Sequence, residues 1–454
     1  MTAGPSIVWL RDDLRVADNP ALRYAADRRG PVVVVFLLDE ASPGIRPLGG
    51  ASRWWLHGSL TALGAELASR GGRLTLRSGP AEQVIPALVR EVRAEAVVWN
   101  RRYGSSRHVD VRLKSALRAE GVEVTSFSAN LLVEPWTVQT ASGSPYRVFT
   151  PFWRAAQERP FREVVEAPAR IDGLEAPGDG LDDWGLLPTR PDWAGGLREA
   201  WTPGEAAARR RLDQFAAHEL ADYHRRDEPA VEATSRLSPH LRFGELSPVQ
   251  VWHRLHGELA PAARRNATGF LRELGWREFS WNILYHWPDL AAQNLRPEFD
   301  AFPWSTPSRE DVTAWQRGQT GIPLVDAGMR ELWATGVMHN RVRMVAASFL
   351  IKNLLIDWRV GEQWFWDTLV DADEASNPFN WQWVAGSGAD AAPYFRVFNP
   401  ELQAAKFDPA GEYLDRWVPE RGTPGYPDPI VDLAQSRRDA LAAFELVKAA
   451  ATLR

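Results

Sequence analysis

The chain has 454 residues, 45% hydrophobic and 24% charged, which is the balance of an ordinary globular protein of more than one domain. The absence of cysteine excludes disulfides, thiolate metal sites and cysteine nucleophiles. A formal net charge of −5 argues against a protein that coats nucleic acid, although it permits a local basic groove. No apolar run approaches the roughly 20 residues that span a bilayer, and residues 1–7 lack a signal-peptide pattern, so we expect a cytoplasmic protein.

Tryptophan is the one unusual residue type, with 22 copies, most of them in the C-terminal half. Most of these are expected to pack in a helical core. Because Trp also stacks on bases and can give an electron to an excited cofactor, the enrichment indicates an aromatic or redox ligand.

The first 130 residues alternate β-branched runs with helical patterns. They predict strands over 6–10, 32–38, 74–77, 96–99 and 122–127, and helices over 53–70, 81–93 and 107–120. Buried strands that alternate with helices indicate a doubly wound parallel sheet. No G-x-G-x-x-G follows the first strand, so this α/β domain carries no dinucleotide fingerprint.

Residues 131–200 are rich in Pro, Gly and Asp, which predicts a long inter-domain connection on the surface. Residues 201–454 are helical in pattern almost throughout, which predicts an all-α C-terminal domain. Within it, Ser247 is a predicted N-cap, with Pro248 in the first turn and Gln250 closing a capping box.

Three hydroxyls and an arginine precede a helical pattern in the segment Thr234–Pro239. Ser238 is a predicted N-cap, with Pro239 at the first helical position. Backbone N–H groups, hydroxyls and the helix dipole would together attract an anion, most naturally a phosphate. A plain capping turn explains the same string, and the string alone favours that interpretation.

Two helix faces combine charged or polar side chains with an apolar one. Each face spaces its residues at i, i+3 and i+4, so that they lie together. The two sets are Glu273, Trp276 and Arg277, and Asn340, Arg343 and Met344. Such a face forms either a surface ion pair beside a packed side chain or the lining of a polar cavity, and two of them favour the cavity.

An acidic cluster follows, in which Asp371 and Asp373 lie two residues apart ahead of Trp381 and Trp383. Carboxylates at this spacing suit Mg²⁺ or Ca²⁺, but few further oxygen ligands follow. A pairing of Asp371 with Arg343 is therefore favoured over a metal, because a buried charge requires a partner. Hydrolase motifs such as G-x-S-x-G, H-E-x-x-H and the P-loop are absent from the sequence.

These clusters, in this order, resemble those of the photolyase/cryptochrome family. Residues 9–22, which begin Trp-Leu-Arg-Asp-Asp-Leu-Arg, look like the family's opening signature. Thr234–Pro239 resembles its flavin diphosphate site, and residues 336–355 and 380–400 resemble its two most characteristic segments. The resemblance covers roughly residues 5–448 and points to the class I photolyases that act on cyclobutane pyrimidine dimers.

The resemblance implies FAD, bound in a U shape inside the helical domain. It implies that Arg343 and Asp371 form a salt bridge beside the isoalloxazine ring, that Asp373 approaches the ring's polar edge and that Asn377 faces flavin N5. The residues implied to hold the phosphates and the ribityl chain are Tyr223, Thr234, Ser235, Arg236, Leu237 and Ser238.

The resemblance also implies light-driven repair of UV-damaged DNA, in which a dimer flips out of the duplex and receives an electron from excited, reduced flavin. Trp276 and Trp383 would be the apolar walls around the dimer, and Glu273 would hydrogen-bond its base edge. Asn340 and Met344 would complete the pocket. The related (6-4) photolyases carry His at the place of Asn340 and another His near Met344, so the cyclobutane dimer is the favoured substrate.

Further roles follow from the same resemblance. The implied electron carriers to the flavin are Trp381, Trp358 and Trp304, and the implied DNA phosphate contacts are Arg226, Arg341, Arg396 and Lys406. Residues 103–107 lack the acidic residue typical of folate antenna sites, which favours a deazaflavin antenna or an empty site. The expected partner is UV-damaged DNA, with no membrane and no obligate protein partner, for a monomer in the bacterial cytoplasm.

The alternative is a cryptochrome-type photoreceptor, which binds FAD but signals through partners. Signalling cryptochromes often carry a long C-terminal extension, whereas one amphipathic helix follows residue 432 here. This short end and the set Glu273, Trp276, Asn340 and Trp383 favour repair.

Overall fold

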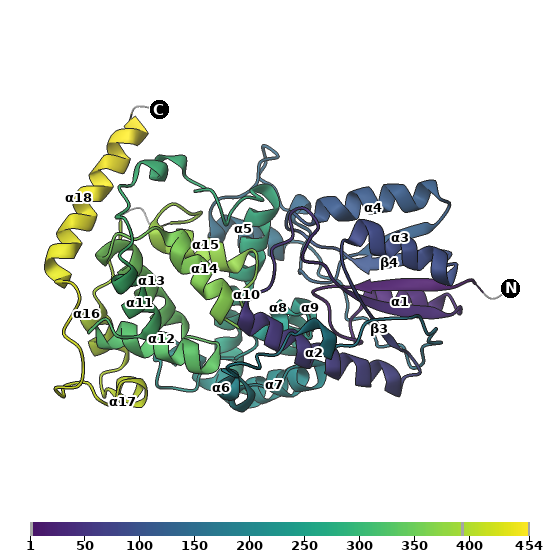
Figure 1. Ribbon diagram of the computed structural model, residues 1–454, viewed down its shortest axis with the longest axis horizontal. Helices are drawn as coiled ribbons and strands as arrows, with labels where there is room; N and C mark the ends of the chain where they lie inside the picture. Colours follow the sequence, from purple (N-terminus) through teal and green to yellow (C-terminus); the bar gives the residue numbers. More distant parts are fainter. Residues whose placement is uncertain (1–2, 392–394, 453–454) are drawn as a thin grey trace.

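The computed structural model describes residues 3–391 and 395–452. An α/β part lies beside a larger helical part, and the C-terminal helix α18 (Leu433–Thr452) forms the far edge of the helical part (Figure 1). No helix within the described residues is both long and apolar enough to cross a membrane.

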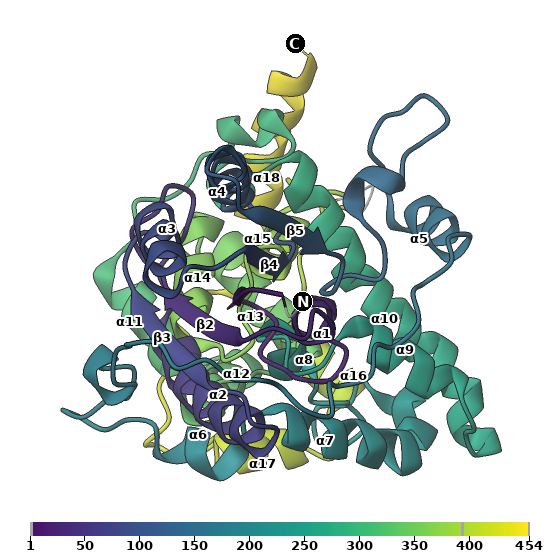
Figure 2. The same ribbon diagram turned by 90° about the vertical axis from the view of Figure 1, so that its right-hand side faces the viewer.

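The α/β part is built on five parallel strands in the order β3-β2-β1-β4-β5. The strands are β1 (Ser6–Leu10), β2 (Val32–Leu38), β3 (Leu74–Ser78), β4 (Ala96–Asn100) and β5 (Glu123–Phe127). Helices α1 (Pro20–Asp27) and α2 (Gly50–Ser69) pack on one face of the sheet, and α3 (Ala81–Val92) and α4 (Arg107–Ala119) pack on the other (Figure 2). Side chains along a strand alternate between the faces, so both faces of the central strands must be apolar. The doubly wound sheet predicted from the sequence is confirmed.

The segment 131–200 contains more structure than a plain connection. It forms η1 (Pro135–Thr137), α5 (Phe149–Gln157), η2 (Asp182–Trp184) and α6 (Gly195–Ala200). The helical part follows with α7 (Glu205–Ala217), η3 (Glu219–Arg225), α8 (Ser238–Arg242), α9 (Pro248–His256), α10 (Pro261–His286), η4 (Pro297–Ala301), α11 (Arg309–Arg317), α12 (Pro323–Thr335), α13 (Asn340–Ser348), η5 (Phe349–Asn353), α14 (Trp358–Thr368), α15 (Ser376–Ala385), α16 (Pro400–Phe407) and α17 (Glu412–Trp417).

The two predicted helix starts have different outcomes. Ser247 caps α9 as predicted: its hydroxyl accepts the N–H of Gln250 at 2.9 Å, and the Gln250 side chain accepts the N–H of Ser247 at 2.9 Å. The prediction that Ser238 is an N-cap is wrong. Leu237 occupies the cap position of α8, and the Ser238 hydroxyl donates instead to Asp371 at 2.7 Å.

Buried polar contacts join the α/β part to the helical part. The fully buried Arg15, which follows β1, donates to the carbonyl oxygens of Gly244 at 2.8 Å and Ala129 at 3.0 Å. Glu278 on α10 accepts the N–H of Leu132 at 2.7 Å and pairs with Arg277 at 3.2 Å. The two parts therefore form a tightly tied unit, in which a loop of one satisfies buried groups of the other.

Glu278 gives this interface a pH dependence. Burial raises its pKa from 4.5 to about 7, although Arg277 and two backbone N–H groups oppose the rise. The folded protein therefore keeps a proton that the unfolded chain releases above pH 4.5. Stability from this group is complete below that pH and is lost as the pH rises through 7, with a slope of at most about 1.4 kcal/mol per pH unit. We expect Glu278→Gln to flatten the decline in unfolding free energy between pH 5 and pH 8, measured by urea denaturation, and an unchanged slope would contradict the assignment.

Candidate functional site

The two predicted helix faces and the acidic cluster meet where α15 packs against both α10 and α13. Helix α10 contributes Glu273 and Trp276, and the ring of Trp276 lies 6.3 Å from that of Phe379 on α15. The exposed Asn340 begins α13, which also packs against α15. Residues far apart in the sequence are thus brought to one region of the helical part.

His339 determines where α13 begins. Its ring Nδ1 accepts the N–H of Arg341 at 3.2 Å, and its own N–H donates to Glu331 at 3.0 Å. Burial lowers the pKa of His339 to about 4, so the imidazole is neutral near pH 7 and its Nδ1 can accept. This cap sets the direction in which Asn340 and Arg343 leave the helix.

An ion pair anchors the centre of the site. Both terminal nitrogens of Arg343 donate hydrogen bonds to the Asp371 carboxylate, at 3.1 and 2.9 Å, which confirms the pairing predicted from the sequence. Asp371 is nearly buried, and it also accepts the hydroxyl of Ser238. Within the described residues, no group of three or more His, Asp or Glu side chains could hold a metal ion.

Asn377 is held by a carboxylate that the sequence analysis missed. Its amide nitrogen donates to the backbone oxygen of Glu362 at 3.0 Å and to the Glu362 carboxylate at 2.8 Å. Arg46, from the loop between β2 and α2, pairs with the same carboxylate at 2.7 Å. Beside them, Asp373 accepts the N–H groups of Ala375 at 2.8 Å and Ser376 at 2.5 Å, so it caps the start of α15.

Trp276 stacks on Phe149, with ring centroids 3.9 Å apart and planes 8° from parallel. Phe149 belongs to α5, so the 131–200 segment contributes directly to the site. One turn earlier on α10, Glu273 is exposed and lies 3.7 Å from Arg226. Partial burial raises the pKa of Glu273, and Arg226 opposes the rise. Trp383, the other predicted wall, donates its indole N–H to the Asp390 carbonyl at 3.1 Å.

Within the segment Thr234–Ser238, the Arg236 side chain packs against a neighbouring helix. Arg236 has a positive φ of 54°, and its guanidinium lies 4.4 Å over the ring of Trp201 and donates to the Ala200 carbonyl at 3.2 Å. This side chain therefore packs against the end of α6. Tyr223 lies buried against Phe215 and Phe270, and burial raises its pKa.

The three predicted electron carriers belong to one hydrophobic cluster of the helical part. Trp381 and Trp358 are buried, and Trp304 is partly exposed. Trp358 donates its indole N–H to Asn294 at 3.0 Å. The fully buried Trp315, whose ring lies 6.2 Å from that of Trp381, was not singled out in the sequence.

The cations predicted to contact DNA phosphates are engaged within the protein. Arg341 pairs with Asp227 at 2.9 Å, and Arg226 lies near Glu273. The Arg396 guanidinium lies 5.8 Å from the ring of Phe398, and the Lys406 ammonium lies 4.8 Å from the ring of Phe407. Contact with DNA would require Arg341 to exchange one anionic partner for another.

Residues 103–107, from which the antenna was predicted, carry no acidic side chain. The fold nevertheless places a carboxylate there, because a Cβ on Gly104 would lie 2.1 Å from Oε2 of Glu374. Burial and nearby Asp12 raise the pKa of Glu374 to about 7, whereas Arg242 and Arg102 lower it. The absence of an acidic residue from 103–107 therefore does not mean that the folded protein lacks an acidic side chain there.

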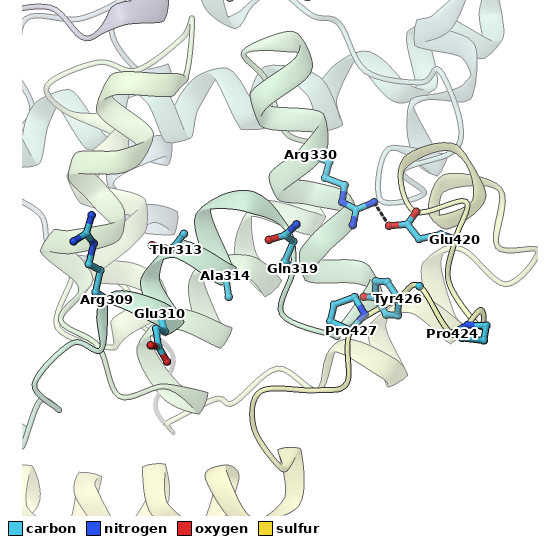
Figure 3. A pocket seen from close by; sticks show the side chains of 11 residues that line it. Arg309, Glu310, Thr313, Ala314, Gln319, Arg330, Glu420, Pro424, Tyr426 and Pro427 are labelled. Carbon is cyan, nitrogen blue, oxygen red and sulfur yellow. Dashed lines mark ion pairs between the residues drawn. The ribbon is translucent and has the colours of Figure 1, made fainter.

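A hollow of about 690 Å³ lies elsewhere, between α11, α12 and residues 420–427 (Figure 3). Arg330 and Glu420 pair at its edge at 2.7 Å, and Tyr426 donates to Asp326. None of the predicted site residues lines it. Since these polar groups satisfy one another, the hollow carries no functional assignment.

Two family models match the chain: "DNA photolyase" over residues 6–169 and "FAD binding domain of DNA photolyase" over residues 270–423. The chain is 48% identical to the deoxyribodipyrimidine photo-lyase of Agrobacterium fabrum, and the match covers 99% of each chain. It belongs to the photolyase/cryptochrome family. Cryptochrome-1 of Arabidopsis thaliana is 39% identical, over 92% of this chain and 63% of that protein.

Among solved structures, this photolyase/cryptochrome chain resembles a class III photolyase from Agrobacterium tumefaciens, with a TM-score of 0.94 and 48% identity over 99% and 98% of the two chains. It also resembles an archaeal photolyase from Sulfolobus tokodaii, with a TM-score of 0.83 and 31% identity over 97% and 99%. Both likenesses agree with the α/β and helical parts described above.

The polar groups of the site fit FAD. The Asn377 amide oxygen has no hydrogen-bond partner within the described chain, and the Arg343 guanidinium is partly exposed beside the nearly buried Asp371. The hydroxyls of Thr234 and Ser235 can donate to a diphosphate, whereas that of Ser238 already donates to Asp371. Donors for phosphate and an acceptor for a ring N–H are the groups that a flavin dinucleotide needs.

Proposed function

We propose that this protein is a deoxyribodipyrimidine photo-lyase, which splits cyclobutane pyrimidine dimers in DNA with light. The observation that carries the proposal is the match over nearly the whole of both chains to a protein of that activity. The exposed Glu273 one turn from the stacked Trp276 supports it, because a flipped-out pyrimidine dimer needs both a polar contact and an aromatic wall.

We assign the protein to class III rather than class I. The class I assignment came from motif resemblance alone, whereas the relative that matches at 48% identity and a TM-score of 0.94 is a class III photolyase. The motifs quoted from the sequence are general to the family and do not separate its classes.

The predicted site residues have separate roles in binding the dimer and the flavin. Trp276 and Trp383 hold the dimer between apolar surfaces, and Glu273 hydrogen-bonds its base edge where negative charge arrives. Asn340 and Met344 close the pocket. The bound FAD supplies the transferable electron. The residues that hold it are Tyr223, Thr234, Ser235, Leu237, Ser238, Arg343, Asp371, Asp373 and Asn377.

Three further roles stay proposals. Trp304, Trp358 and Trp381 carry electrons from the surface to the interior, which the partial exposure of Trp304 and the burial of the other two support. The DNA phosphates are contacted by Arg226, Arg341, Arg396 and Lys406. The preference for a deazaflavin antenna is tested by acid release of the chromophore from purified protein, and a folate would contradict it.

The function is tested by absorption and repair. The purified protein is expected to show flavin bands between 300 and 500 nm, and to remove dimers from UV-damaged oligothymidine under reducing conditions in light but not in darkness. Glu273→Ala combined with Asn340→Ala should abolish repair while the flavin bands remain. The matched control, Glu310→Ala combined with Gln319→Ala, changes the same kinds of side chain at the hollow of Figure 3 and should repair normally.

A cryptochrome-type photoreceptor is the second candidate, because the match to Cryptochrome-1 covers 92% of this chain. It predicts flavin bands without loss of dimers. Folded protein without flavin would contradict both candidates.

A further inference from the structure

A loop of the α/β part is closely seated on α14 of the helical part. A Cβ on Gly49 would lie 2.2 Å from the Trp366 carbonyl oxygen, so the backbones approach more closely than any other residue would allow. Trp366 donates its indole N–H to the Pro47 carbonyl at 2.8 Å, and the Gly50 N–H donates to Asp367 at 2.8 Å. The loop therefore has a defined position against this helix.

Arg46 is the charged residue of that loop. Its two terminal nitrogens donate to the two carboxylate oxygens of Glu362, at 2.7 and 3.0 Å, and its guanidinium lies 4.1 Å over the Trp366 ring. The Glu362 side chain is only 4% exposed. A charge so deeply buried requires a partner of this kind.

Glu362 in turn orients Asn377. Both contacts from Asn377 end on oxygens that can only accept, namely the Glu362 carbonyl and carboxylate, so both must receive the amide N–H₂. The amide oxygen then necessarily points the other way. Of these two acceptors, only the side-chain carboxylate can move away, and Arg46 is the cation that holds it beside the Asn377 amide.

We infer that Arg46 is a positioning residue for the flavin: by holding the Glu362 carboxylate in place, it makes Asn377 present its oxygen, and not its N–H₂, to the cofactor. The inference rests on the proposed function, in which Asn377 faces flavin N5. A reduced flavin carries N–H at N5 and an oxidised flavin carries a bare nitrogen, so an acceptor oxygen favours the reduced state. A residue of the α/β part thus adjusts the redox balance of a cofactor held by the helical part.

The test is redox titration of the flavin-loaded full chain. Arg46→Met removes the charge of this long side chain. At a fixed potential it should lower the ratio of reduced to oxidised flavin about fivefold, the change in equilibrium constant expected for one lost hydrogen bond. Adding Glu362→Gln should restore the ratio, because a neutral amide oxygen still accepts from Asn377 and needs no cation. Asp367→Ala, which loses a contact of the same loop, is the matched control and should leave the ratio unchanged.

Each other outcome is informative. A wild-type ratio in Arg46→Met, an equal fall in Asp367→Ala, or no rescue by Glu362→Gln would overturn the inference. Asn377→Ala separates it from the proposed function. A fall in Asn377→Ala without one in Arg46→Met leaves the flavin placement intact, whereas no change in either variant overturns both the inference and that placement. Failure of the wild-type chain to bind FAD would contradict the proposed function itself.

Discussion

Asp371→Ala should leave a folded protein that no longer retains its flavin. The substitution removes the partner of Arg343 and the acceptor of Ser238 in one step. Removing one member of a buried pair costs about 3 kcal/mol, which corresponds to a fall in Tm of roughly 6 °C or more for a domain of this size. In the flavin-loaded protein the freed guanidinium is also no longer held beside the cofactor, so we expect loss of FAD on gel filtration.

The matched variant is Asp371→Asn. Its amide oxygen still accepts from Ser238, but the charge that neutralises Arg343 is gone, so it separates hydrogen bonding from charge. The ratio of flavin to protein absorbance and the Tm report the two losses independently. Full flavin retention in Asp371→Ala would show that the Arg343–Asp371 pair does not hold the cofactor.

Trp276→Ala should weaken binding of damaged DNA roughly 10- to 100-fold, because aromatic stacking on a base contributes about 1–3 kcal/mol. The loss should be specific to the lesion, since an unflipped duplex does not reach this ring. Affinity for an undamaged duplex of the same length should therefore change little. Fluorescence anisotropy with both duplexes at one salt concentration measures the difference.

Two companion variants sharpen this result. Phe149→Leu keeps an apolar contact under Trp276 but removes the stacked ring, so it should give a smaller loss of lesion affinity than Trp276→Ala. Trp333→Ala removes an indole that is 57% exposed on α12 and should bind both duplexes normally. An equal loss of affinity for damaged and undamaged DNA in Trp276→Ala would contradict the wall assignment.

The sheet could be predicted from the sequence because its signal is local. Each buried strand is a β-branched run such as Val32–Leu38, and the predicted strand ends differ from the observed ones by one residue at most. Helix α1 was missed because it has only eight residues, too few for a clear apolar period, although Asn19 caps it. Helix α2 begins at Gly50, three residues before the expected start, since its first turn contains Gly and Ala.

The site was predicted where it depends on helix periodicity and missed where it depends on packing between the two parts. Glu273 and Trp276 share a face of α10 by spacing alone, and Asp371 finds Arg343 because a buried charge needs a partner. No local pattern indicates that Arg46 meets Glu362, or that Phe149 lies under Trp276. The N-cap predicted at Ser238 failed because Asp371, distant in the sequence, takes the hydroxyl.

The stack of Phe149 on Trp276 also constrains how the protein is made. During synthesis the α/β part and α5 leave the ribosome before α10, and such N-terminal units generally fold first. The ring of Phe149 then remains exposed until the part of the chain that carries Trp276 has been translated. Contacts between residues so distant in the chain form late and slow folding. The surface proposed for the lesion is therefore completed at the end of folding, so a helical part expressed without residues 131–200 would lack it.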